Sequence, residues 1–252
     1  MNDFQFHRLL PRSRRGWPIE EGPRKLSLIL EQGGLGERPA EDSSVRNRVG
    51  GQDSTGPFAG SNPALGTTQA LLRKNYANAR NKYRPARVNV LLVAESPPSS
   101  GGYFYAEKAI GKDHLFRETM KALELWPVDR PMRKGCDKRP MLKHFRSLGF
   151  FLIDTCELPV DKMPPRQRRL STIQGALTLP HRVKELDPGR ILIVKKTVFN
   201  RARQALSIAG FEDRILNKKS LPFPSHGNQR RFRRMMRRLV KSKRTKGGVR
   251  IS

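Results

Sequence analysis

The sequence predicts an α/β domain built around a parallel sheet, and three apolar runs carry that prediction. Val88–Val93, Phe150–Ile153 and Arg190–Val194 are short, largely apolar and bounded by turn residues. Such runs are typical of strands that are buried on both faces of a parallel sheet. Segments with helical periodicity separate the runs, and this alternation indicates right-handed crossovers between parallel strands.

The first half of the domain, which we expect to span residues 68–242, alternates helix and strand. A basic helix over Thr68–Tyr83 leads into the first strand. Helices over about His114–Leu125 and Met141–Leu148 precede the second strand. Gly149 follows the second of these helices, where glycine commonly ends a helix.

The second half continues the alternation. A helix over Ser171–Leu186 joins the second and third strands, and Pro180 should break or kink it. A helix over Val198–Ala209 follows the third strand, and Ile215-Leu216 is a candidate for a short fourth strand. A last helix over about Gln229–Lys241 has an apolar stripe at helical spacing, with arginines on the opposite face. The stripe consists of Phe232, Met235, Met236, Leu239 and Val240, and the arginines are Arg230, Arg231, Arg233, Arg234, Arg237 and Arg238.

The two ends of the chain differ from this domain. Residues 1–67 are rich in Gly, Pro, Ser and Arg and keep no apolar period, which predicts disorder. Gly60-Ser61-Asn62-Pro63 resembles the T-arm of a tRNA gene read as protein, so this region is alternatively a mis-assigned extension, with a genuine start near Gln69. Residues 243–252 are expected to form a basic, flexible tail.

The net charge of +29 is concentrated in the predicted domain. Residues 67–252 carry 42 basic and 14 acidic side chains, whereas residues 1–66 carry nine and eight. A folded domain this basic favours a polyanionic partner, and nucleic acid is the usual one; the alternative is a solvated basic surface. No run of about 18 apolar residues predicts a membrane span.

Cysteine and histidine patterns predict neither a cofactor nor a metal. Two cysteines, Cys136 and Cys156, are too few for a disulfide framework or for a four-thiolate cluster. The five histidines lack metal-ligand spacing, and the first residues lack the apolar core of a signal peptide. We therefore expect a cytoplasmic, nucleoid-associated monomer without a metal cluster.

Two loops carry a resemblance to a known family. Ala94-Glu95-Ser96-Pro97-Pro98 follows the first strand, and Phe223-Pro224-Ser225-His226 precedes the last helix. Together, and in this order, they resemble the first and last motifs of the uracil-DNA glycosylase superfamily, Gly-Glu-x-Pro-Gly and His-Pro-Ser-Pro. The resemblance covers roughly Arg87–Val240.

The resemblance implies a three-layer α/β/α fold with a short, mainly parallel sheet, which the candidate fourth strand would make four-stranded. It also implies a base-excision repair enzyme that flips a base out of DNA, duplex or single-stranded, and hydrolyses its N-glycosidic bond without a cofactor. The catalytic residues would be Glu95 and His226. Phe104 or Tyr105 would stack on the flipped base, and Asp154 would read the base edge. The DNA phosphates would contact Ser96, Ser225, Asn228, Arg230, Arg231 and Arg234.

Three positions depart from the family motifs. Ala94 replaces glycine, and Phe223 stands where the last motif has histidine, so that His226 is the only imidazole nearby. Asp154 stands where many members carry asparagine. An ionised Asp accepts hydrogen bonds but donates none, so we expect a preferred base other than uracil, with a donor on its edge. These departures leave open a non-catalytic nucleic-acid-binding module with the same fold, or an RNA- or ribosome-associated protein.

Overall fold

The computed structural model describes residues 63–242, so most of the predicted N-terminal extension and the whole predicted tail lie outside the described residues. Three parallel strands form the sheet, in the order β2-β1-β3: β1 (Val90–Ala94), β2 (Phe150–Asp154) and β3 (Arg190–Ile193). Every residue of β1 and β2 is buried, as the apolar runs predict.

The predicted fourth strand is wrong. Ile215 and Leu221 each make only an isolated parallel bridge, to Ile191 and to Val194 respectively. The apolar stretch at Ile215-Leu216 is two residues long, and Pro222 has no N–H to extend the ladder beyond Leu221. The sheet of the described chain therefore has three strands.

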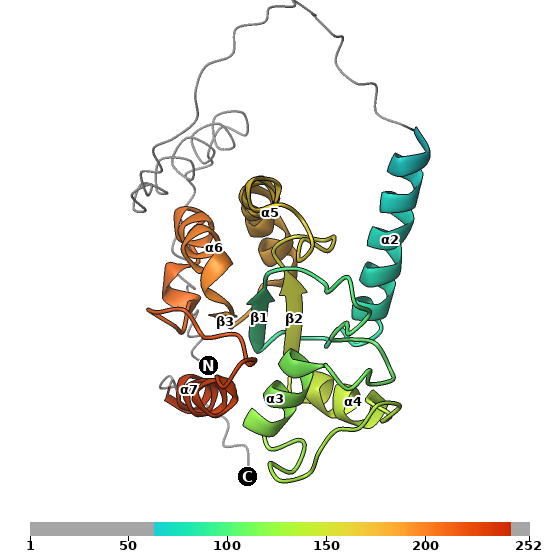
Figure 1. Ribbon diagram of the computed structural model, residues 1–252. Helices are drawn as coiled ribbons and strands as arrows, with labels where there is room; N and C mark the ends of the chain where they lie inside the picture. Colours follow the sequence, from blue (N-terminus) through green and yellow to red (C-terminus); the bar gives the residue numbers. More distant parts are fainter. Residues whose placement is uncertain (1–62, 243–252) are drawn as a thin grey trace, which may run out of the picture.

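Helices lie on both sides of the sheet (Figure 1). On one side lie α5 (Pro165–Leu186) and α6 (Lys196–Ile208), which pack against each other. On the other side lie α3 (His114–Ala122), α4 (Arg139–Ser147) and α7 (Gln229–Ser242), with α7 packed on α3. A short 3₁₀ helix, Glu212–Arg214, follows α6.

Helix α2 (Pro63–Asn81) extends along one edge of the molecule, five residues longer at its start than predicted (Figure 1). Only its last turns reach the core, through Tyr76 and Ala79. Helix α5 continues through Pro180, so the proline does not break the helix, the first of the two effects predicted for it. The buried side chains Leu179 and Val183 hold the turn around this proline against the core, which offsets the missing backbone N–H.

No helix among residues 63–242 is both long enough and apolar enough to cross a membrane.

Candidate functional site

Three charged side chains lie where the strands end. Glu95 directly follows β1, Asp154 ends β2 and Lys195 lies two residues beyond β3. Strand register places Ala94 beside Asp154 and Val93 beside Ile193, so the three residues share one edge of the sheet. We call this group, Glu95, Asp154 and Lys195, the carboxyl edge. Ligands of open α/β sheets bind at such edges.

Glu95 is buried and fully paired. Arg168 on α5 donates to both carboxylate oxygens, with Nε 3.1 Å from Oε1 and Nη2 2.6 Å from Oε2. Lys195 also donates to Oε2, and the Thr197 hydroxyl donates to Oε1 at 2.8 Å. Burial raises the pKa of Glu95, but these donors outweigh it and the pKa lies below its usual value. Glu95 is therefore held as a carboxylate, with its lone pairs already occupied by protein donors.

Lys195 holds this cluster from a strained backbone. Its φ of 80° lies in the left-handed region, which is costly for a residue with a side chain. Its N–H donates to the Leu221 carbonyl at 2.8 Å, and its ammonium lies 5.2 Å from the centre of the Phe223 ring. Phe223 thus contacts the carboxyl edge through Lys195.

Asp154 has the opposite environment. Its side chain is also buried, with 4% of the residue exposed, yet no described residue donates a hydrogen bond to its carboxylate. Burial raises its pKa to about 7, and the charge of Glu95 adds to the rise, while Arg80 and Arg182 oppose it. Arg182 instead donates to the backbone carbonyls of Asp154 and Thr155, at 2.7 and 2.8 Å. With a pKa of about 7, Asp154 has both its protonated and its ionised form populated near neutral pH, unlike Glu95, which is held as a carboxylate.

The structure does not bring His226 to Glu95. His226 is exposed, has a φ of 49°, and pairs through Nδ1 with the Ser225 hydroxyl at 2.9 Å. Its described electrostatic neighbour is His114, at the start of α3. No described contact joins the two predicted catalytic residues.

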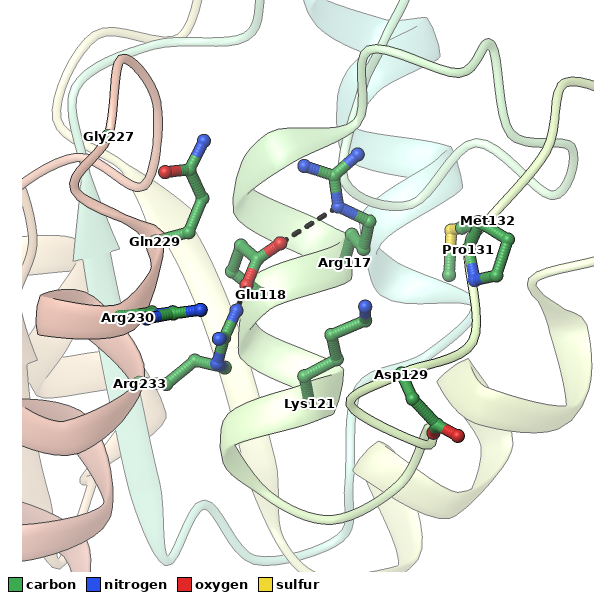
Figure 2. Close-up of a pocket in the computed structure, with 10 residues that line it drawn as sticks. All are labelled: Arg117, Glu118, Lys121, Asp129, Pro131, Met132, Gly227, Gln229, Arg230 and Arg233. Carbon is green, nitrogen blue, oxygen red and sulfur yellow. Dashed lines mark hydrogen bonds and ion pairs between the residues drawn. The ribbon is translucent and has the colours of Figure 1, made fainter.

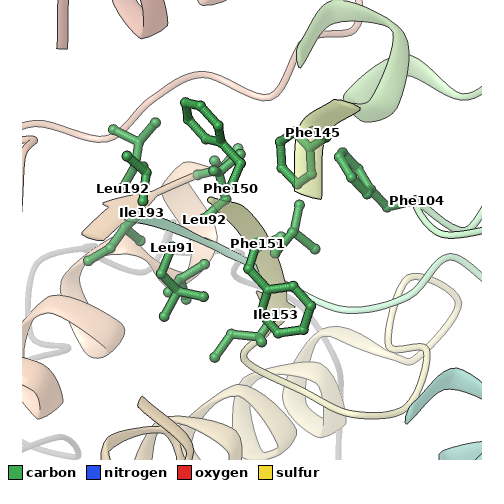
Figure 3. Close-up of a cluster of buried hydrophobic side chains, with 14 of the residues drawn as sticks. Leu91, Leu92, Phe104, Phe145, Phe150, Phe151, Ile153, Leu192 and Ile193 are labelled. Carbon is green, nitrogen blue, oxygen red and sulfur yellow. The ribbon is translucent and has the colours of Figure 1, made fainter. Parts of the chain in front are cut away.

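The aromatic residues predicted to stack on a base, Phe104 and Tyr105, are both buried in the core, where Figure 3 shows Phe104 beside Phe145. Phe104 packs against Phe116 and Phe145, with ring centres 5.2 and 5.4 Å apart. The Tyr105 hydroxyl donates to the carbonyl of Leu152 and accepts from its N–H. Leu152 lies in β2, an outer strand of the sheet, whose far side has no neighbouring strand. Tyr105 therefore supplies the hydrogen bonds that a further strand would have made to the backbone of Leu152. Neither ring is free to stack on a ligand in this conformation.

Of the polar residues predicted to contact phosphate, one is used within the fold and two remain partly exposed. Ser96 is half-buried, and its hydroxyl accepts from the N–H of Val160 at 3.4 Å. Ser225 and Asn228 lie in the loop before α7, where the Asn228 N–H donates to the Ser225 carbonyl. This loop remains partly exposed, whereas Ser96 serves to hold the loop after β1.

The arginines of α7 fall into two groups. Arg233 pairs with Glu118, and Arg237 lies 3.8 Å from Glu124 and donates to the carbonyls of Ala122 and Lys121, so these two dock α7 on α3. The other four are exposed and form no ion pair with the described residues. We call these four, Arg230, Arg231, Arg234 and Arg238, the arginine face.

Sequence reasoning missed three members of the Glu95 cluster, namely Arg168, Lys195 and Thr197, as site residues. A lysine directly after a parallel strand is a usable signal for Lys195. The sequence offers no comparable signal for Arg168, because it is one of several arginines at the start of α5 and lies 73 residues from its partner Glu95.

Cys136 and Cys156 are both free, and among residues 63–242 no three His, Cys, Asp or Glu side chains gather into a group that could hold a metal. Compared with known proteins, the chain matches no protein-family model and no curated protein.

Proposed function

We propose that the protein binds DNA across the arginine face and the adjoining carboxyl edge. The observation that carries this proposal is the division of the α7 arginines: two dock the helix, and four are exposed and have no acidic partner among residues 63–242. Phosphate contacts supply most of the sequence-independent affinity of DNA-binding proteins, and arginines displayed along one helix face suit them.

The loop before α7 supports the same placement. It joins the carboxyl edge, through the bridge between Val194 and Leu221, to the start of α7. This loop therefore connects the end of β3, beside Lys195, to the first turn of the helix that carries the arginine face. The partly exposed Ser225 and Asn228 lie along that path and offer polar groups to phosphates.

Salt dependence tests the proposal. Binding of labelled duplex DNA, single-stranded DNA and RNA is measured by fluorescence anisotropy over a range of salt concentrations. Each lost phosphate contact reduces the slope of log K against log salt by about 0.9 for duplex DNA, so Arg231→Gln with Arg234→Gln should reduce it by about 2. The matched control is Lys143→Gln with Arg146→Gln, an equal charge change at exposed positions of α4. Equal slopes for the two double variants, or stronger binding of RNA than of DNA, would refute the proposal.

A second candidate function, glycosylase-type base excision, rests on Asp154. A buried carboxyl to which no residue among 63–242 donates a hydrogen bond, and whose pKa is raised to about 7, is suited to proton transfer at neutral pH. The test is abasic-site formation on oligonucleotides that contain uracil, hypoxanthine or other lesions. Asp154→Asn should abolish cleavage, whereas His226→Ala should leave it nearly unchanged, because His226 has no described contact with the carboxyl edge. The absence of abasic sites on every substrate would leave binding alone.

A further inference from the structure

A basic pocket lies between α3, the start of α7 and the loop at residues 126–132, apart from the carboxyl edge (Figure 2). Its volume is about 460 Å³. The charged groups that line it are Arg117, Lys121, Arg230, Arg233, Glu118 and Asp129. We call it the α3–α7 pocket.

Positive charge in this pocket exceeds negative charge. Glu118 is already shared, since Arg117 Nε lies 2.8 Å from Oε1 and Arg233 pairs with Oε2. Asp129 is exposed at the rim, and its carboxylate points away from the other charged groups (Figure 2). Lys121 and Arg230 have no carboxylate within ion-pair distance among residues 63–242. An anion that entered the pocket would meet two cations with no acidic partner of their own.

Lys121 is the most informative of these groups. Only 7% of the residue is exposed, and burial lowers the pKa of its ammonium. The one described acceptor is the Val128 carbonyl, 2.6 Å from Nζ. An ammonium has three N–H donors, so this contact leaves donors to spare. Glu118 and Asp129 favour the charged form of Lys121, but burial outweighs them and its pKa lies below the ordinary value, so a bound anion would stabilise the buried ammonium.

The start of α7 adds backbone donors on the opposite wall. The loop turns at Gly227, whose φ of 81° is readily adopted by glycine, and α7 begins two residues later at Gln229. The N–H groups of a first helical turn have no acceptor within the helix, and the positive end of the helix dipole favours anions there. Gln229 and Arg230 both line the pocket.

We propose that the α3–α7 pocket binds a phosphate group of the nucleic acid. Lys121 and Arg230 would be its main ligands, and Arg117 would be the third cation beside it. This inference rests on the proposed function, because Arg230 belongs both to the arginine face and to the pocket. A DNA strand bound along that face would thus have one of its phosphate groups next to the pocket. The shared chemistry is a tetrahedral oxyanion, so inorganic phosphate serves as the probe.

The first experiment measures the affinity for inorganic phosphate by calorimetry, at an ionic strength held constant with chloride. Arg230→Gln and Lys121→Gln should each weaken binding about tenfold, the loss expected for one charge-assisted hydrogen bond. Lys121→Gln keeps an amide donor for Val128, and circular dichroism verifies that each variant is folded. Arg146→Gln on α4 is the matched control and should bind phosphate like the wild type. No phosphate binding, or equal affinity in all four proteins, would overturn the proposal.

The second experiment separates this pocket from the proposed function. The same variants are titrated with short DNA oligonucleotides. If phosphate binding depends on Lys121 and Arg230 but DNA does not bind, the pocket stands and the proposed function fails. If DNA binds and depends on Arg231 and Arg234, while Lys121→Gln leaves the affinities for both phosphate and DNA unchanged, the pocket fails alone.

Discussion

Replacing Asp154 by asparagine should stabilise the fold at alkaline pH, which is the reverse of the usual effect of a mutation in a protein interior. The pKa of Asp154 is raised from its ordinary value of 3.8 to about 7 by burial. Between these two pH values the folded state keeps a proton that the unfolded chain releases, so stability falls as pH rises and the loss is complete above about pH 7. Three pKa units correspond to about 4 kcal/mol of unfolding free energy, which an uncharged asparagine does not lose.

Urea unfolding followed by circular dichroism, at about pH 8 and about pH 5, measures this difference. Asp154→Asn should raise the unfolding free energy by about 2–4 kcal/mol at the higher pH and by about 1–2 kcal/mol at the lower one. Asp113→Asn is the matched control, since Asp113 is equally buried but accepts from Lys138 at 3.1 Å and from the Ile110 N–H at 2.7 Å. It should destabilise the fold by about 3–5 kcal/mol, because it leaves the buried Lys138 ammonium unpaired. An Asp154→Asn variant that is destabilised, or whose stability gain does not depend on pH, would refute the reasoning.

Three further predictions concern residues at or near the sheet. Glu95→Gln should cost about 2–3 kcal/mol in urea unfolding near neutral pH, less than a fully buried pair because Arg168 and Lys195 are each more than a quarter exposed. Since the pKa of Glu95 is lowered, this cost should be complete above the ordinary glutamate pKa of 4.5 and should shrink as pH falls from there through the lower pKa of the folded state. Glu107→Gln, at an exposed ion pair, should change stability much less. Tyr105→Phe should lower the unfolding free energy by about 2–3 kcal/mol, because the backbone N–H and carbonyl of Leu152 both lose their partner. Hydrogen exchange at the Leu152 amide should become faster, and unchanged exchange would contradict this role of Tyr105. Gly175→Ala should lower the thermal midpoint by several degrees, since its Cβ would lie 2.4 Å from the Thr155 carbonyl oxygen, whereas a midpoint equal to that of the wild type would show that α5 can move away from β2.

The strands were predictable because the signal for each one, a short apolar run between turn residues, lies within the strand itself. Continuous apolar runs between turns predicted β1, β2 and β3 to within two residues. The stripe on α7 was predictable for the same reason, and Phe232 and Met236 are fully buried. The fourth strand failed because two apolar residues do not distinguish a strand from a buried bridge.

Side-chain partners were less predictable, since they depend on contacts distant in sequence. An aromatic triplet after a strand fits a ligand pocket and a core equally well, and only the packing of Phe104 against Phe145 decides between them. Periodicity placed six arginines on one helix but could not show which of them α3 would neutralise. The pairing of Arg168 with Glu95 likewise depends on how α5 crosses the end of the sheet.

The two neighbouring carboxyl groups at the sheet edge are best understood as a pair. Donors from Arg168, Lys195 and Thr197 keep Glu95 ionised. Burial raises the pKa of Asp154, the charge of Glu95 adds to the rise, and no residue among 63–242 donates a hydrogen bond to the Asp154 carboxyl group. Environments that separate the pKa values of two adjacent acids give them different proton-transfer roles. DNA bound along the arginine face would bring further negative charge, raise the pKa of Asp154 again and favour its protonated form. Asp154 would then donate a hydrogen bond to a base, and an edge with acceptors, such as that of uracil, would no longer be disfavoured.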